Sequence, residues 1–383
     1  MRLRIKEICD YVSRGTTPDY VDEGANKVMN QATFSKGWID ESNIRYTSKA
    51  NKGARIMKGD LLMASTGGGV LGKVFFFDDD DSFYADSHVT IMRNSKGANL
   101  MKYLYYYFYL RYEEINATMV KGSTNQTELQ RNYLLSYELD VPTLADQQRM
   151  ITYLDTKLSE IDHQVSLLTS KRDAYLRLKK SIINHAVTRG LDPNVKMKDS
   201  GIEWIGEVPE HWEVKRMKDI CALSPNIKSC PEYEYGSYLP MEGLRLDQIE
   251  TSDELVSTLQ GKYTPFEDND LLVAKVTPCF ENGNIAIAKG LTNGVGFGSS
   301  EIFVLRANKY NNIRFLFYMS LSSKFHDKAC ATMCGVGGLK RISPLFMKTY
   351  IMAIPPSTEQ NAIATYLDDK CAKIDTIVSN LDK

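Results

Sequence analysis

One glycine-rich segment has the spacing of a site for phosphate chemistry. Gly67, Gly69 and Gly72 spell GxGxxG, and Gly67, Gly72 and Lys73 spell GxxxxGK. Either pattern binds nucleotide phosphates when it follows a strand and opens a helix. Here Val74 stands where a Walker loop needs Ser or Thr, and phenylalanines that favour a strand follow it. We interpret the segment as a loop between two strands; a nucleotide-binding enzyme is the alternative, and ATP binding by the chain would test it.

The other chemically suggestive residues form no catalytic pattern. The five histidines are scattered, and the chain has no NPPY- or DPPY-like motif of adenine methyltransferases. Asp155-x-Lys157 and Asp368-x-Lys370 match the tail of a nuclease motif, but both lie in predicted helices, where a surface ion pair is the simpler interpretation. The acidic run Phe77–Asp81 is typical of a solvated turn. The sequence therefore predicts neither an enzyme nor a metal site.

Composition describes an ordinary globular protein. Hydrophobic residues make up 43% and charged residues 25%, and the net charge of −1 leaves room for local basic patches that could bind nucleic acid. The seven scattered cysteines favour reduced thiols. The N-terminus lacks an apolar signal core, and the most apolar stretch, Tyr103–Leu110, is too short to span a bilayer. We expect a cytoplasmic protein.

The elements that must position any site occur twice. A shift of 213 residues carries VPTLADQQRMITYLDTKLSEID at Val141–Asp162 onto IPPSTEQNAIATYLDDKCAKID at Ile354–Asp375. Upstream, KEIC at Lys6–Cys9 recurs as KDIC at Lys218–Cys221. The period is domain-sized, longer than the roughly 20–50 residues of a solenoid repeat. The chain is therefore predicted to be a tandem of two like halves.

Each half is predicted to be an α+β globule followed by a long helix. The strongest strand signals are LLMAS, KVFFF, HVTIM, LLVAK, IAIA and IFVLR, and the helix signals are LMKYLYYYFYLRYEEI and NIRFLFYMSLSS. The predicted domains are residues 1–142, a central helix over 143–190, a junction over 191–212, a second globule over 213–355 and a short helix over 356–383.

The two helices carry matching heptad seams. The central helix has no Gly or Pro before Gly190 and would be roughly 65 Å long. We expect the helices to pair as an antiparallel coiled coil about a pseudo-two-fold axis, although a generic coiled-coil hairpin or adaptor is a simpler alternative. The predicted pairing or partner-contacting residues are Leu154, Leu158, Ile161, Val165, Leu168, Tyr175, Ile182, Leu367, Ile374, Val378 and Leu381.

Polar, glycine-rich loops occur in matching places in both halves but differ in sequence. Their residue types can read base edges and hold phosphates, although they are also ordinary in surface turns. The candidate DNA-binding residues of the first half are Thr16, Thr17, Asn30, Gln31, Ser35, Lys36, Ser65, Thr66, Gly67, Gly68, Lys73, Ser123, Thr124, Asn125 and Gln126. Those of the second half are Glu242, Arg245, Lys275, Thr277, Glu281, Asn282, Gly337, Gly338, Lys340 and Arg341.

With these residues in view, the chain resembles the specificity subunit of type I DNA restriction–modification systems. The resemblance rests on the doubled PxxxxQxxxxxYLDxK…ID segments, on KDSGIEWIGEVPEHWEVKRMKDI at Lys198–Ile220, and on TPCFENGNIAIAKGL, GFGSSEIFVLR and GVGGLKR. It covers essentially the whole chain.

The resemblance implies two target recognition domains that each read half of a bipartite double-stranded DNA site, with helices that fix the spacer. It also implies two methyltransferase subunits as partners, which methylate adenine N6, and an ATP-dependent restriction subunit. S-adenosylmethionine, ATP and Mg²⁺ would then belong to the partners, and the chain would have no cofactor. The alternative is an orphan or phage-defence specificity protein serving another methyltransferase.

The sequence departs from the repeat at its end. A second full cycle would need about 43 residues more, so the second helix is about half as long as the first. We expect Lys171–Arg189 to lack a partner within the chain, which would expose Tyr175, Leu176, Ile182 and Ile183.

Overall fold

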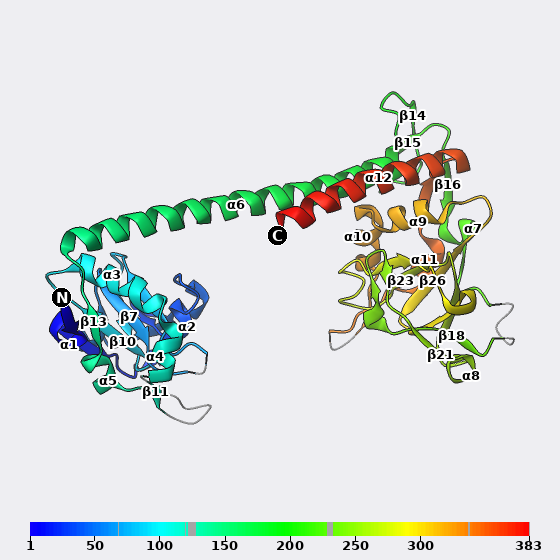
Figure 1. Cartoon of the computed structure of the whole chain (residues 1–383). Helices are drawn as coiled ribbons and strands as arrows, with labels where there is room; N and C mark the ends of the chain where they lie inside the picture. The colour runs from blue at the N-terminus through cyan, green and yellow to red at the C-terminus, as the bar shows by residue number, and fades with distance from the viewer. Residues whose placement is uncertain (68, 119, 122–127, 228–232, 336–337, 383) are drawn as a thin grey trace. The chain divides into compact units, whose positions relative to one another are not determined.

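The computed structural model describes the chain except for residues 68, 119, 122–127, 228–232, 336–337 and 383 (Figure 1). It contains two compact units, Met1–Gln164 and Val165–Lys383. Each combines small sheets with short helices, and two long helices, α6 (Leu144–Arg189) and α12 (Ser357–Leu381), follow the globular parts. The α+β class, the internal repeat and the long helices are as the sequence predicts.

Unit 1 is built around a four-stranded antiparallel sheet that is buried on both faces. Leu61 and Met63 of β7 pack with the short helices, whereas Leu62 and Ala64 pack against the second sheet. This alternation follows from the two-residue period of a strand. The strand order is β2 (Tyr11–Arg14), β10 (Val89–Arg93), β7 (Asp60–Ala64) and β8 (Val74–Phe77).

The second sheet of unit 1 has five short strands and one parallel pair, β4 with β9. Its order is β3 (Tyr20–Val21), β5 (Arg45–Thr47), β4 (Asn26–Met29), β9 (Phe83–Ala85) and β6 (Arg55–Ile56). The other elements of unit 1 are β1 (Arg2–Arg4), α1 (Ile5–Ile8), α2 (Gln31–Phe34), η1 (Glu41–Asn43), η2 (Lys52–Ala54), α3 (Ala98–Tyr109), α4 (Tyr112–Thr118), β11 (Val120–Lys121), β12 (Glu128–Leu129), α5 (Arg131–Ser136) and β13 (Glu138–Asp140).

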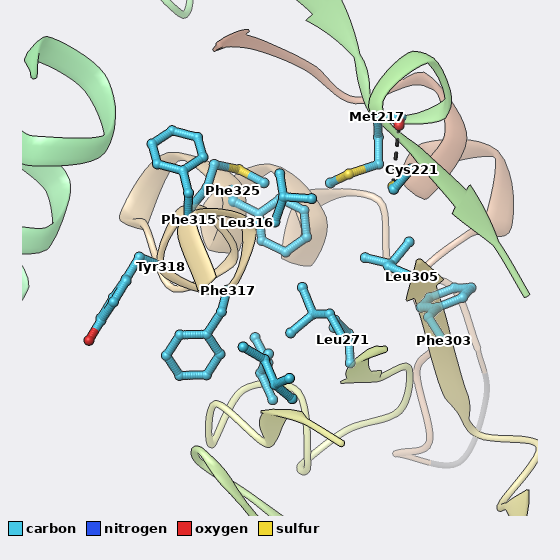
Figure 2. Close-up of a cluster of buried hydrophobic side chains, with 14 of the residues drawn as sticks. Met217, Cys221, Leu271, Phe303, Leu305, Phe315, Leu316, Phe317, Tyr318 and Phe325 are labelled. Atoms are coloured by element: carbon cyan, nitrogen blue, oxygen red, sulfur yellow. Dashed lines mark hydrogen bonds between the residues drawn. The ribbon is translucent and has the colours of Figure 1, made fainter. Parts of the chain in front are cut away.

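Unit 2 repeats this topology. Its first sheet has the order β17 (Cys221–Leu223), β26 (Ile302–Ala307), β23 (Leu271–Ala274) and β24 (Ile285–Ile287). Its second has the order β21 (Ser252–Leu255), β18 (Tyr235–Leu239), β25 (Val295–Gly298) and β22 (Thr264–Glu267), and β18 and β25 are again parallel. Figure 2 shows Phe315, Leu316 and Phe317 of α9 (Ile313–Ser320) near Leu271 and Leu305 of the sheet, in one buried cluster.

The remaining elements of unit 2 frame this core. They are β14 (Met197–Asp199), β15 (Glu207–Pro209), β16 (Glu213–Arg216), α7 (Met217–Ile220), η4 (Met241–Gly243), β19 (Leu244–Arg245), β20 (Gln248–Ile249), α8 (Val256–Leu259), η5 (Thr292–Gly294), α10 (Ser323–Ala331), α11 (Pro344–Thr349) and β27 (Ile351–Ile354). Among the described residues, no helix is both long and apolar enough to cross a membrane.

The same buried ion pair supports the central sheet of each unit. Arg93 donates from Nε and Nη2 to the carboxylate of Asp60, with both distances at 2.6 Å. In unit 2, Arg306 donates in the same way to Asp270 at 2.7 and 2.6 Å. Both aspartates are almost fully buried. A buried carboxylate needs such a partner because its desolvation is otherwise uncompensated.

The glycine-rich segment is a turn between strands, as the sequence predicts. It joins β7 to β8, which pair antiparallel, and Gly67, Gly69 and Gly72 all have positive φ. Lys73 Nζ donates to the Ser35 carbonyl at 3.1 Å. Strand β8 follows Lys73 directly, and no helix begins among the described residues of the segment, so these residues offer no helix N-terminus of the kind that phosphate loops use.

The long helices begin at a repeated turn. Gln147 donates its side-chain amide to the Pro142 carbonyl at 2.9 Å, and Gln360 does the same to Pro355 at 2.9 Å. Helix α6 ends at Gly190, whose φ of +77° is the left-handed conformation that terminates helices.

Within unit 2 the end of α6 pairs with α12. Lys179 Nζ lies 2.7 Å from Asp375 Oδ1, and Arg172 Nη1 lies 3.6 Å from Asp382 Oδ1. As the α6 residue number falls by seven, the α12 number rises by seven, so the helices run antiparallel.

The prediction that Lys171–Arg189 lacks a partner is therefore wrong. Ile183 is buried with α12 residues, and Tyr175 and Ile182 are half-buried; of the four residues expected to be exposed, Leu176 is. The reason is geometric: an antiparallel partner that starts beside the end of α6 must cover the C-terminal half of α6. The exposed stretch is the N-terminal half.

Removing the buried carboxylate of unit 1 should destabilise that unit. Asp60→Asn leaves the Arg93 guanidinium without its charge partner and should cost about 3 kcal/mol. Thermal unfolding would show a lower transition temperature. Asp81→Asn is the matched control, because Asp81 pairs with Lys27 on the surface, and it should leave the transition unchanged. Equal transitions for both variants would contradict the role assigned to Asp60.

Candidate nucleic-acid interface and partner surface

In unit 1 three predicted residues from two separate segments come together. Ser35, Lys36 and Lys73 line one cavity of about 560 Å³, whose walls include the exposed rings of Trp38 and Tyr109. Lys36 also pairs with Asp40 at 2.7 Å, and Gln31 reaches toward Gly67. Helix α2 with the turn that follows it and the glycine-rich loop are therefore neighbours.

Thr16 and Thr17 lie at a different, smaller hollow. They line a cavity of about 170 Å³ together with Thr47, Lys49 and Asn51. Asn51 Nδ2 donates to Thr16 Oγ1 at 3.2 Å. Thr17 is exposed, so its hydroxyl is free to meet solvent or a ligand.

Two predicted contact residues also have structural roles. Asn30 is the N-cap of α2, and its Oδ1 accepts from the backbone amides of Ala32 and Thr33 at 2.8 and 3.1 Å. Ser65 is fully buried, and its hydroxyl lies 2.5 Å from Thr90 Oγ1. Because the Ser65 side chain is buried, it cannot touch DNA in this conformation, and that prediction is corrected. The sequence alone does not show whether the residue that follows β7 points into the core or toward solvent.

Unpredicted residues stand beside Thr66. Thr66 Oγ1 lies 2.5 Å from His88 Nδ1, and Glu128, which bridges to Thr66 through the backbone, forms an ion pair with Arg14. Arg14 also donates from Nε to the Ser87 carbonyl at 2.9 Å. Arg14 is the last residue of β2, two residues before the predicted Thr16, and nothing in the sequence marks His88.

In unit 2, Thr277 holds the segment that contains Gly338, Lys340 and Arg341 in place. Its buried hydroxyl donates to the Gly338 carbonyl at 2.9 Å and accepts from the Lys340 amide at 3.0 Å. Lys340 and Arg341 are thereby presented on the surface. Arg341 makes a two-pronged ion pair with Glu301, with Nε 2.9 Å from Oε2 and Nη2 3.0 Å from Oε1.

Lys275 lies next to this pair. Its Nζ donates to the Ser300 carbonyl at 2.7 Å and sits 4.8 Å from the centre of the Phe303 ring. Burial lowers the pKa of Lys275, and the nearby Glu301 carboxylate opposes that shift. The structure therefore brings Lys275, Thr277, Lys340 and Arg341 together.

The other predicted residues of unit 2 are exposed. Glu242 and Arg245 are exposed around η4 and β19, and Glu281 and Asn282 are exposed in the turn before β24. Among the hydrogen bonds and ion pairs of the described residues, none joins these four to Lys340 or Arg341. The candidates Gly68, Ser123, Thr124, Asn125, Gln126 and Gly337 lie outside the described residues.

The helix seam is buried in one part and exposed in another. Leu367 and Ile374 are buried, and Leu154, Tyr175, Ile182, Val378 and Leu381 are half-buried. Leu158, Ile161, Val165 and Leu168 form the exposed stripe of α6, with 44–56% of each residue accessible. An apolar stripe of this kind is typical of a surface that binds another protein.

With this geometry established, comparison with known proteins identifies the class. Residues 1–167 and 209–381 match the family model of the type I restriction modification DNA specificity domain. These ranges contain both globules, the first half of α6 and all of α12, so the chain belongs to that family.

Individual proteins with similar sequences are specificity subunits of type I restriction enzymes. The EcoEI specificity subunit of Escherichia coli is 32% identical over 161 residues, which are 41% of this chain and 27% of that protein. The putative MjaX specificity subunit of Methanocaldococcus jannaschii is 23% identical over 379 residues, 95% of this chain and 84% of that protein. The match to the EcoEI subunit thus spans only about a quarter of that relative.

Solved structures share the fold. A chain from a structure of complex assembly and conformational transition of the type I R-M system has a TM-score of 0.70 at 13% identity, covering 100% of this chain and 92% of that one. The HsdS subunit of Thermoanaerobacter tengcongensis has a TM-score of 0.55 at 14% identity, covering 100% and 91%.

Thr277→Val should release the Gly338–Arg341 segment. Valine keeps the shape of the side chain but removes both hydrogen bonds, so the segment should open more often. Limited trypsin digestion should cut after Lys340 or Arg341 severalfold faster than in the wild type. Thr349→Val is the control, because its hydroxyl donates to the Leu345 carbonyl within α11. Unchanged cleavage in Thr277→Val would show that Thr277 does not hold the segment.

Proposed function

We propose that this chain is the DNA recognition subunit of a type I restriction–modification system. Its two globules read the two halves of a bipartite double-stranded DNA target and direct adenine-N6 methyltransferase and ATP-dependent restriction subunits to it. The observation that carries the proposal is one scaffold built twice with dissimilar polar loops. A repeated scaffold supports two comparable binding sites, and different loops support different half-sites.

The loop chemistry supports this division. His88 and Glu128 of unit 1 correspond, at the repeat of 213 residues, to Glu301 and Arg341 of unit 2. The ion pair at this place is Arg14–Glu128 in one unit and Arg341–Glu301 in the other. The position shared by Glu128 and Arg341 therefore offers a carboxylate in unit 1 and a guanidinium in unit 2. Carboxylates accept hydrogen bonds from cytosine, and guanidinium groups donate to guanine, so the two sites differ in what they can read.

We assign the chemistry to partner subunits. The sequence has no adenine-methyltransferase motif, and its GxxxxGK segment lacks the Ser or Thr that binds Mg²⁺. S-adenosylmethionine, ATP and Mg²⁺ would then be bound by the methyltransferase and restriction subunits, and this chain would be non-catalytic. The exposed stripe of α6 offers a surface on which a methyltransferase helix could pack.

The alternative is an orphan or phage-defence specificity protein. The relatives named above are all specificity subunits of type I enzymes, which favours the type I assignment. A nucleotide-binding enzyme is disfavoured by the hairpin context of Gly67–Lys73. ATP binding by the isolated chain, lost in Lys73→Ala, would revive it.

The decisive experiment is a methylome comparison. Deleting the gene should abolish N6-adenine methylation at one asymmetric bipartite motif while leaving other motifs unchanged. Restoring the gene should restore the same motif. If no motif changes on deletion, the proposed function is wrong.

Exchanging one globule should change one half-site. Residues 1–142 keep β1 and β13 together, because Arg2 and Leu3 pair with Asp140 and Leu139. A chain carrying another family member's equivalent of 1–142 should methylate a motif with one new half and one old half, as read by methylome sequencing. A change in both halves would contradict independent reading.

A further inference from the structure

A repeated polar contact ties each long helix to its globule. In unit 1 the Tyr106 hydroxyl donates to Asp155 Oδ1 at 2.5 Å, and Lys102 Nζ lies 2.7 Å from Asp155 Oδ2. In unit 2 the Tyr318 hydroxyl and Arg314 Nε donate to Asp368 Oδ1 at 2.7 and 2.6 Å. In both units the globule supplies a helix with a basic residue and, four residues later, a tyrosine. Both of these side chains bind the aspartate carboxylate of the long helix. The two aspartates are those of the repeated YLDxK motif.

The tyrosines are suited to this role. Burial, followed by the hydrogen bond to the aspartate, raises the pKa of Tyr106 and of Tyr318. Both phenols therefore stay protonated and remain donors at neutral pH. The contact persists as a charge-assisted hydrogen bond plus an ion pair, which is stronger than a neutral hydrogen bond.

The apolar contacts around this aspartate on the long helix differ between the two units. In unit 2, Leu367, Cys371 and Ile374 are buried on either side of Asp368, in a seam that includes the end of α6. In unit 1, Ile151 is the last buried residue of α6 before Gln164, and beyond Asp155 this part of α6 is exposed. Unit 1 therefore depends on Asp155 more than unit 2 depends on Asp368.

Two separated contacts determine the direction in which a helix leaves a globule. In unit 1 the first is at the helix start, where Gln147 bonds Pro142 and Asn99 Nδ2 donates to Gln148 Oε1 at 2.7 Å. Asp155 lies about 11–12 Å further along the helix, at about 1.5 Å per residue. Without it, α6 can pivot about its first two turns.

A small pivot matters for DNA. A globule of this size is roughly 30–35 Å across. A tilt of about 10° would move its far side by about 5 Å, which exceeds the rise of about 3.4 Å per base pair. Figure 1 shows β11 at the end of unit 1 remote from α6.

We propose that Asp155 is a positioning residue that fixes the angle between the first recognition domain and the spacer helix, and thereby the spacing between half-sites that the protein accepts. This inference rests on the proposed function and concerns spacer length, which is separate from base reading.

The test uses the full chain in complex with its methyltransferase subunits. DNA probes carry the motif from the methylome with the natural spacer, one base pair fewer or one more, and competition binding gives the affinity ratios. The wild type should prefer the natural spacer strongly. Asp155→Asn should bind the natural probe within about threefold of the wild type but lose roughly tenfold of its preference against the altered spacers.

Two matched variants separate positioning from general loss of charge. Glu160→Gln removes a carboxylate on the same helix that pairs with Lys157, three residues away, and should discriminate like the wild type. Tyr106→Phe removes only the hydroxyl and should relax discrimination partially, which keeps the test informative if Asp155→Asn folds poorly. Asp368→Asn should have a smaller effect than Asp155→Asn, and Asp369→Asn, whose carboxylate pairs with Lys373 one turn along the same helix, should have none.

The outcomes are distinguishable. If the wild type binds no bipartite probe, the proposed function falls and this inference falls with it. If the wild type discriminates and Asp155→Asn and Tyr106→Phe discriminate equally well, only the inference is overturned. An equal loss of affinity on all three spacers, with an unchanged melting temperature, would also overturn it, because Asp155 would then act on affinity and not on spacing.

Discussion

The fold depends on how a long, mostly polar helix is attached to a small globule. The last strand of each globule is followed within two residues by a proline, and the chain turns there with the proline carbonyl partly buried in unit 1 and buried in unit 2. Withdrawing a carbonyl from water without a donor is costly, and Gln147 and Gln360 stabilise the turn by supplying that donor from the second turn of the helix. The hydrogen bond fixes where each helix begins. The positions of the seam, the aspartate contact and the globule core along the helix then follow from helical geometry.

Comparison of the two units separates contacts that maintain the scaffold from contacts that differ between the units. The Arg–Asp pair under the central sheet, the Pro–Gln turn and the aspartate contact recur with nearly the same distances in both units. The surface ion pair at the end of the sheet differs between the units: Glu128 pairs with Arg14, whereas Arg341, at the position that corresponds to Glu128, pairs with Glu301. Contacts that maintain the scaffold are thus the same in both units, while this surface ion pair has the opposite charge at the shared position and a partner from another position. Such a division is expected when two copies keep one fold and bind different ligands.

Much of the fold could be predicted because its signals are local. The apolar runs that become β7, β8, β10, β23, β24 and β26 have the length and composition of buried strands, and the Gly-free segment before Gly190 has the heptad spacing of a long helix. The rejection of Gly67–Lys73 as a phosphate loop also rests on local context. The orientation of a loop residue does not: Ser65 faces inward, where its hydroxyl meets Thr90 of a neighbouring strand 25 residues away.

The error about the helix ends has the same origin. Heptad spacing shows that a seam exists, but which residues it meets depends on an antiparallel register between segments nearly 200 residues apart. Likewise His88 and Arg14 approach Thr66 and Glu128 only through the sheet, so no spacing in the sequence marks them. Local periodicity specifies elements, whereas long-range register specifies sites.

The antiparallel register also indicates what the exposed stripe of α6 can bind. Leu158 and Ile161 correspond to Cys371 and Ile374 of α12, which are buried against the end of α6. The same seam is thus satisfied in one copy and open in the other. Burying a leucine, isoleucine or valine side chain contributes about 1.5–3 kcal/mol, so a helix that covered the four residues of the stripe would gain several kcal/mol. Because the buried copy shows that this seam accepts an antiparallel helix, the open copy is suited to a helical partner, which agrees with the docking surface proposed for a methyltransferase subunit.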